Sequence, residues 1–175
     1  MFWFIYHLPL HVVIFASFLA PALWALFTGL ASRFPKAVRV INILAFAVSL
    51  GGILCFTLFR SQSGERELIL TPLHSFIEAR QQKEMYRSML MNVALFVPMG
   101  ISLPYVLSSK KSVIKTVLTA LVLSVIIEAL QLAFGLGRCE TDDVLCNTLG
   151  AAVGGISFIL SEKLTECRTS KRKTE

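Results

Sequence analysis

The stretch that decides the fold is Ser124–Gly154, SVIIEALQLAFGLGRCETDDVLCNTLGAAVG. It places a carboxylate and an amide, Glu128 and Gln131, inside an apolar segment, and a short charged turn then leads into a second apolar segment. A charged side chain inside a membrane segment costs about 2.5–3.5 kcal/mol on insertion scales, so such a group generally has a partner or a function. The stretch therefore predicts two membrane helices joined by a polar turn at which a functional site is centred.

The composition of the whole chain predicts an integral membrane protein. Of its 175 residues, 55% are hydrophobic and only 16% are charged, whereas a soluble domain carries about 25% charged residues. The mean hydropathy is +0.69, and the apolar residues form blocks of about 20, the length that crosses roughly 30 Å of hydrocarbon. No amphipathic period divides these blocks into a polar and an apolar face, which argues against a soluble core.

Five such blocks predict an all-α fold, a polytopic transmembrane helical bundle in a single domain. Pro98 in the third block predicts a kink, and Gly51-Gly52 in the second predicts a close approach between helices. The long connection after the second block predicts an interfacial helix at approximately 72–86, with a solvated loop as the alternative. Residues 161–175 predict a basic, frayed cytoplasmic tail. The expected spans are approximately 9–30, 40–59, 89–107, 113–134 and 143–160.

The distribution of Lys and Arg predicts the orientation of the bundle. Eleven of these residues lie in 32–39, 108–115 and the tail, against six in 60–88 and 135–142. The positive-inside rule then places the C-terminus in the cytoplasm and the N-terminus outside. Because the positive residues flank membrane segments, the net charge of +6 indicates contact with anionic phospholipid at the cytoplasmic face and argues against nucleic acid.

The five-span topology brings the polar residues of the last three spans to one end of the bundle, the predicted outer end. Glu128 precedes Phe134 by six residues, which is about 9 Å of helix, so Glu128 would lie beneath the outer surface within reach of Arg138. The converging residues are Asn92, Glu128, Gln131, Arg138, Glu140, Asp142, Asp143 and Asn147.

Helical spacing groups these residues on two faces. In the fourth span the carboxylate and the amide are three residues apart and share a face. In the fifth span, Asp143 and Asn147 are four residues apart, and the small residues Gly150 and Gly154 continue the same stripe. Small residues on one stripe predict that this span packs closely against a neighbouring backbone.

Two interpretations fit the converging residues. In the first, they form a satisfied polar plug without a ligand, in which Glu128 pairs with Arg138 and Asn147 bridges two helices. In the second, they form an outer-leaflet pocket in which Arg138 meets an anionic group, while Glu128 and Asp143 do acid–base or cation-holding work. No Ser/His or Cys/His nucleophile pair accompanies them, so an enzyme and a non-catalytic binding protein are both open. The ligand-binding candidates are Arg138, Asn92, Gln131, Asn147 and Asp142.

A metal site is a weaker alternative. His7 and His11 are four residues apart, His74 lies in the predicted outer loop, and Asp142 and Asp143 could add ligands. The HxxxH spacing is common by chance, so we expect neither a metal nor another cofactor. The four cysteines form no CxxC pair and are expected to be free thiols.

Three motifs follow one another in the last three spans: Asn92–Gly100 (NVALFVPMG), Glu128–Gln131 (EALQ), and Arg138 followed by Asp142–Gly150 (DDVLCNTLG). In these motifs the chain resembles the VanZ-like family of bacterial integral membrane proteins, over approximately residues 60–160. Glu140 and Asp142 are both candidates for the first acidic position of the family's pattern. The family takes its name from a protein associated with low-level resistance to teicoplanin. The resemblance implies a multi-pass protein of the bacterial plasma membrane that meets a membrane lipid or lipid-linked cell-wall precursor in the outer leaflet.

Overall fold

The structure, a computed structural model, describes residues 9–59, 68–73, 77, 83–109, 111–136 and 138–174. Five helices in this part of the chain are long and apolar enough to cross a membrane, which confirms the all-α, five-span prediction. A 3₁₀ turn, η1, joins the first two, and two short strands, β1 and β2, lie outside the helices. The elements are α2 (Leu10–Leu30), η1 (Ala31–Arg33), α3 (Pro35–Phe59), β1 (Leu68–Ile69), α5 (Lys83–Leu107), α6 (Ser112–Phe134), β2 (Cys139–Glu140) and α7 (Thr141–Thr174).

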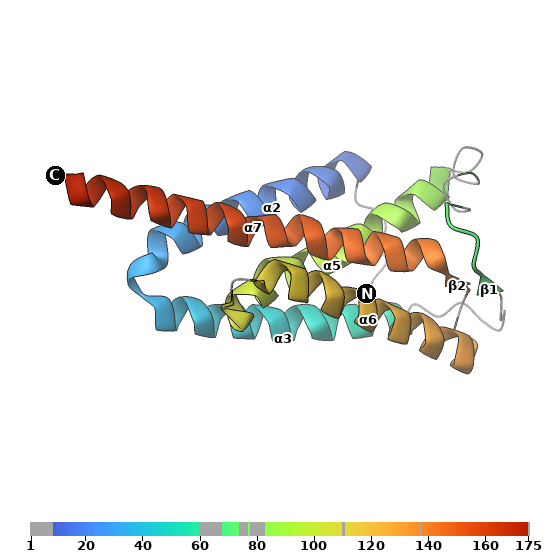
Figure 1. The fold of residues 1–175 in the computed structure, drawn as a ribbon. Coiled ribbons are helices and arrows are strands. Elements are labelled where there is room, and N and C mark those ends of the chain that lie inside the picture. Colours follow the sequence, from blue (N-terminus) through green and yellow to red (C-terminus); the bar gives the residue numbers. More distant parts are fainter. Residues whose placement is uncertain are drawn as a thin grey trace.

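Successive long helices run in opposite directions, so their connections alternate between two ends of the bundle (Figure 1). One end holds β1 and β2 and is termed the β end; the other holds η1 and is termed the η end. The two strands pair in parallel, with Leu68 opposite Cys139 and Ile69 opposite Glu140. This pairing ties the connection between α3 and α5 to the turn between α6 and α7.

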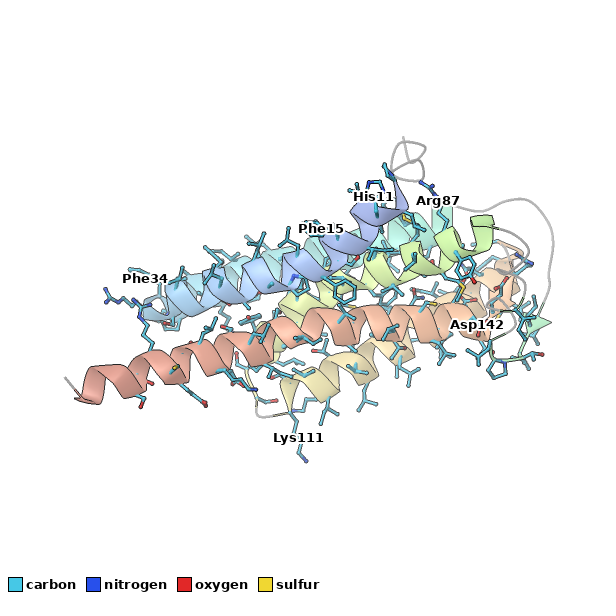
Figure 2. The ribbon with its side chains drawn as sticks, turned by 90° about the horizontal axis from the view of Figure 1, so that it is seen from above. His11, Phe15, Phe34, Arg87, Lys111 and Asp142 are labelled. Atoms are coloured by element: carbon cyan, nitrogen blue, oxygen red, sulfur yellow. The ribbon has the colours of Figure 1, made fainter. Side chains whose placement is uncertain are left out.

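Residues that are far apart in the sequence lie toward the same end of the bundle, the β end. In Figure 2, His11, Arg87 and Asp142 lie toward one end of the bundle, whereas Phe34 lies toward the other. The arrangement agrees with the alternation of the helices. That the β end faces the outside stays a prediction, since it rests on the count of Lys and Arg.

Glycines allow α5 and α7 to pack backbone against backbone. A Cβ atom added at Gly150 would meet the carbonyl oxygen of Val93, and one at Gly154 would meet the carbonyl oxygen of Val97. On α5, Gly100 faces the α7 backbone in the same way. The close packing predicted from the stripe of small residues on the fifth span is therefore confirmed.

The glycine pair of α3 has no such role. A Cβ atom at Gly51 or Gly52 would meet nothing within 4 Å, so the predicted close helix approach is wrong for the part of the chain that the structure describes. Instead α3 contributes an isoleucine to the core, which lies between α3, α5, α6 and α7. The core cluster comprises Ile53, Phe96, Met99, Leu103, Ala120, Ile127 and Ala151.

Several boundaries differ from those expected. α7 continues as a helix to Thr174, so the prediction of a frayed tail is wrong for the described residues. α5 begins at Lys83, before the expected start of the third span, and contains Pro98; the kink at Pro98 stays a prediction. Of the expected interfacial helix at 72–86, Pro72 and Leu73 form a turn, in which Leu73 has a left-handed φ of 64°. Residues from 83 onward belong to α5, and residues 74–76 and 78–82 lie outside the described residues.

Uncharged polar side chains connect three helices near the η end. Oγ1 of Thr28 lies 2.9 Å from Oη of Tyr105 and 3.0 Å from Oγ of Ser161. The Tyr105 hydroxyl also donates to the carbonyl oxygen of Ser157 at 3.2 Å. These hydrogen bonds join α2, α5 and α7 inside the bundle.

Candidate functional site

Glu128 is buried at the β end of α6. This helix ends at Phe134 and is capped by Gly135. The left-handed φ of 63° at Gly135 turns the chain back toward the bundle. The return places Glu140 over the helix, and Oε2 of Glu128 accepts the backbone N–H of Glu140 at 3.0 Å. Since Glu128 is only 4% exposed, its carboxylate lies beneath the turn and is held by a main-chain donor.

Asn147 faces α6 one level deeper in the bundle. Its Nδ2 donates to Oγ of Ser124 at 2.8 Å, and Ser124 lies one turn before Glu128 on the same face of α6. Asn147 is 3% exposed, and its Oδ1 has no hydrogen-bond partner within the described residues. The amide nitrogen of Asn147 therefore joins α7 to α6, and its amide oxygen is a buried acceptor.

Arg138 forms an ion pair with Glu140, whereas the plug interpretation expected a pair with Glu128. Nε of Arg138 lies 3.2 Å from Oε1 of Glu140, and the Arg138 side chain is 42% exposed. Glu140 thus contacts two members of the cluster, because its N–H holds Glu128 and its carboxylate holds Arg138. An exposed pair contributes only about 0–1 kcal/mol, and Arg138 retains nitrogen donors that can meet an anion.

Asp142 fastens the α3–α5 connection to the first turn of α7. Its Oδ1 accepts the backbone N–H of Leu73 at 2.7 Å, and Asp142 is 2% exposed. Beside it, Oγ1 of Thr141 lies 3.4 Å from the carbonyl oxygen of Ile69. A carboxylate in the first helical turn is also stabilised by the helix dipole. These contacts and the β1–β2 pairing close the cluster on one side.

The pKa of the Cys139 thiol reflects the charges that surround the turn between α6 and α7. The pKa of its thiol is raised above the ordinary value of 9.0, first by burial and then by the negative charges of Glu128, Asp143 and Glu140. Three carboxylates therefore act on one point of the turn. Cys139 and Asp143 are both partly exposed, so part of the negative cluster is accessible to solvent while Glu128 is buried.

Gln131, one of the expected ligand-binding residues, is directed away from this cluster. Nε2 of Gln131 donates to the carbonyl oxygen of Thr57 on α3 at 3.1 Å, so Gln131 and Glu128 contact different elements. Asn92 is 8% exposed, and it directly precedes Val93, whose carbonyl oxygen lies against Gly150 of α7. The structure thus brings together Glu128, Asn147 and the charged turn, and directs Gln131 elsewhere.

The elements that build the cluster fall within a known protein family. The model of the VanZ/LLP1 family matches residues 46–162, more than half of the chain. The chain belongs to the VanZ/LLP1 family. No curated protein and no solved structure matches it.

The VanZ/LLP1 match bears directly on the site. Residues 46–162 include the second part of α3, both strands, α5, α6 and the first part of α7, whereas α2 precedes the match. Every residue of the candidate site therefore lies inside the family region. The match supports the five-helix membrane protein as a whole and leaves the ligand to be inferred from the site.

Sequence reasoning missed two residues of the cluster. Helical spacing could have predicted Ser124, because this residue precedes Glu128 by four residues and therefore shares its helix face. Cys139 gave no local signal, since its position depends on how the turn folds back over α6. Both sit next to predicted residues and complete the description of the cluster.

The metal alternative can be compared with the structure only in part, because one of its three histidines, His11, lies in the described residues. Among the described residues, no group of three or more His, Cys, Asp and Glu side chains could hold a metal ion. His11 is exposed at the start of α2, and His7 and His74 lie outside the described residues. The described cluster is made of carboxylates, an amide and a guanidinium.

Proposed function

We propose that this VanZ/LLP1 protein resides in the bacterial plasma membrane and binds an amphiphilic, lipid-linked ligand of the cell envelope at its β end. Binding there would lower susceptibility to teicoplanin and related lipoglycopeptides. The observation that carries the proposal is the burial of three polar residues within the family region. Glu128, Asp142 and Asn147 are each 4% exposed or less, and because such groups are expensive to bury in a membrane protein, they commonly mark a functional site.

Each part of the cluster has a role in this proposal. The exposed Arg138 contacts an anionic group of the ligand, as arginine commonly does with phosphate. Glu128 and Asp143 carry a proton or hold a cation, and Asn92, Asp142 and Asn147 orient the bound group. As an enzyme the protein would transfer or hydrolyse a lipid head group; as a binding protein it would shield the ligand from the drug.

The test is teicoplanin susceptibility of a sensitive Gram-positive host that expresses the wild type, Glu128→Gln or Asp143→Asn at matched membrane levels. The proposal expects protection by the wild type and loss of protection in both variants. Glu166→Gln is the matched control, because Glu166 is exposed near the far end of α7. Equal protection by all four proteins, or none by the wild type, would contradict the proposal.

A structural polar plug is the second candidate. It is favoured by internal contacts, since Glu128 binds the Glu140 N–H, Asp142 binds the Leu73 N–H and Asn147 binds Ser124. A plug predicts that Glu128→Gln lowers the amount of folded protein and leaves the protection per folded molecule unchanged. Dividing protection by the folded amount, measured by size-exclusion of a fluorescent fusion, separates the two candidates.

A further inference from the structure

A groove lies between α2 and α5 in the half of the bundle next to the β end, where both helices begin (Figure 1). Residues 12–20 of α2 and 91–101 of α5 border it, and it is termed the α2–α5 groove. Its volume is about 270 Å³. Val13 and Val97, which are 8% and 3% exposed, form its floor. The groove exists because small side chains, among them Ala16, Ala20 and Ala94, line its walls.

The lining of the α2–α5 groove is apolar. Ser17 carries the one polar side chain among the lining residues, and its Oγ donates to the carbonyl oxygen of Val13 at 2.8 Å. This hydroxyl is satisfied within α2, so a bound molecule meets hydrocarbon on both walls. Ala16, Ala20 and Pro98 are exposed, so the groove opens to the surroundings of the bundle, which in a membrane are lipid chains. The occupant is therefore apolar along the length of the groove.

The dimensions of the groove fit a single hydrocarbon chain. From Val12 to Ala20 α2 rises about 12 Å, and from Met91 to Ile101 α5 rises about 15 Å. A volume of about 270 Å³ over this length gives a mean cross-section of about 20 Å², close to that of one extended hydrocarbon chain. A helix is about 10–12 Å across, so a helix of a partner or of a second copy is too wide. The length is also about half of the roughly 30 Å of hydrocarbon in a bilayer, which is one leaflet.

Arg87 lies at the end of the groove that opens toward the β end. It precedes Met91 by four residues, so it lies on the same face of α5, about 6 Å nearer that end. On α2, His11 directly precedes Val12, and Figure 2 shows His11 and Arg87 at this end of the bundle. Arg87 also interacts within the chain, but a guanidinium carries five N–H donors and can hold a phosphate in addition to a protein partner. A cation thus lies one turn above an apolar groove, at the depth of the lipid head groups.

We propose that the α2–α5 groove binds one phospholipid, with an acyl chain along the groove and the phosphate at Arg87. The apolar lining, the length of one leaflet and the cross-section of one chain each fit this ligand. The site is separate from the cluster around Glu128, because no residue of α6, β2 or α7 lines the groove, so it goes beyond the proposed function. Since α2 precedes the family region and α5 lies inside it, the lipid would join the first helix to the family core.

The test maps where a photoactivatable phospholipid reacts with the full-length protein in vesicles. The probe is a phosphoglycerol lipid with a diazirine in the middle of one acyl chain, and the cross-linked peptides are identified by mass spectrometry. Val125 of α6 is 50% exposed and reports contact with bulk lipid in the same half of the bundle. Residues of the groove should be labelled at least about fivefold more than Val125, because the phosphate contact keeps the chain in place.

Two substitutions fill the groove from opposite walls. Ala16→Phe adds a ring on α2, and labelling is then measured on α5; Ala94→Leu adds a side chain on α5, and labelling is then measured on α2. In each variant labelling of the unchanged wall should fall about fivefold, to the level of Val125. Ala47→Phe is the matched control, since Ala47 is exposed on α3, and it should leave the labelling of the groove unchanged. Size-exclusion measures the folded amount of every variant.

A second lipid tests the phosphate contact. A glucosyl lipid with the same diazirine chain but no phosphate should label the groove about fivefold less than the phosphoglycerol lipid. Arg87→Gln should remove this difference between the lipids. Arg87→Lys should retain part of it, because lysine keeps the charge but loses the planar fork of donors.

Each contrary result overturns a defined part of the proposal. Equal labelling of the groove and of Val125, or unchanged labelling in the folded groove-filling variants, overturns the lipid site. Weak labelling of the groove in a protein that elutes as a dimer assigns the groove to a second copy instead. Equal labelling by the two lipids, or an unchanged difference in folded Arg87→Gln, overturns the phosphate contact. Teicoplanin susceptibility tests the proposed function separately, so either proposal can fail without the other.

Discussion

The two ends of the bundle bury polar side chains in different ways. Near the η end, Thr28, Tyr105 and Ser161 are uncharged and contact one another across three helices. At the β end, Glu128 and Asp142 are carboxylates that are held by backbone N–H groups of the connecting segments. Uncharged hydrogen bonds between membrane helices contribute roughly 0.6 kcal/mol each, whereas buried carboxylates are costly. The difference supports the proposal that the functional site lies at the β end, whereas the uncharged hydrogen bonds near the η end stabilise the bundle.

The largest expected effect comes from disrupting the packing of α5 against α7, because both ends of the bundle depend on this contact. Gly150→Leu should eliminate most of the folded protein, because the new side chain meets the α5 backbone and overpacking costs about 3 kcal/mol or more where nothing can move aside. Size-exclusion of the detergent-extracted protein measures the folded fraction. Gly52→Leu is the matched control and should fold normally, since that position is open. Equal yields would show that the α5–α7 contact is not essential.

The second prediction tests which end of the bundle faces outward. The expected difference in cysteine labelling is close to all-or-none. Single-cysteine variants that retain Cys139 or Cys167 are treated on intact cells with a membrane-impermeant maleimide. Cys139 lies at the β end and Cys167 is exposed near the far end of α7. We expect Cys139 to react on intact cells, slowly at neutral pH because its thiol is little ionised and faster as the pH is raised, and Cys167 to react only after permeabilisation. The reverse pattern would invert the predicted orientation and the outer-leaflet proposal with it.

The third effect compares the stabilities of two buried amides, Asn42 and Asn147. Asn42→Leu loses two satisfied hydrogen bonds and should lower the free energy of unfolding by about 2 kcal/mol. Asn147→Leu loses one hydrogen bond but also removes an unpaired buried acceptor, so its destabilisation should stay below about 1 kcal/mol. Thermal unfolding of both variants in one detergent measures the difference. A greater loss in Asn147→Leu would indicate that this amide is mainly structural.

The smallest effect sharpens the electrostatic part of the comparison. Because burial and neighbouring carboxylates raise the pKa of Cys139 above 9.0, its thiolate is scarce at neutral pH, and alkylation should become half-maximal only above pH 9.0. Asp143→Asn removes one negative charge, lowers that pKa and should increase the rate at pH 8 severalfold, with Glu166→Gln as control. The rates are measured in a variant whose other cysteines are replaced. A midpoint below pH 9.0 would argue against the negative cluster.

Helical periodicity was sufficient to predict much of the fold and part of the site. The five spans follow from apolar blocks, and the close packing of α7 follows from Gly150 and Gly154 on one stripe. The i, i+4 spacing also placed Asp143 and Asn147 on a single face. These features depend on residues within one helix, where the backbone geometry is known in advance.

Contacts that depend on folded connections could not be predicted in this way. The partner of Arg138 is Glu140 because the turn folds back beside β1, and no spacing rule specifies that turn. Gln131 reaches α3 because helix neighbours around a bundle are not encoded by its spacing from Glu128. Gly51 and Gly52 resemble a packing motif, but the same composition occurs on an open helix face.

The hydrogen bond from Glu140 to Glu128 has a consequence for genetics. The donor is the main-chain N–H, which every residue except proline possesses. A mutational scan at position 140 would therefore register the loss of the carboxylate that holds Arg138, while the support of Glu128 would persist in all variants but one. Comparison of Glu140→Pro with Glu140→Ala would reveal a contribution that side-chain truncation leaves silent.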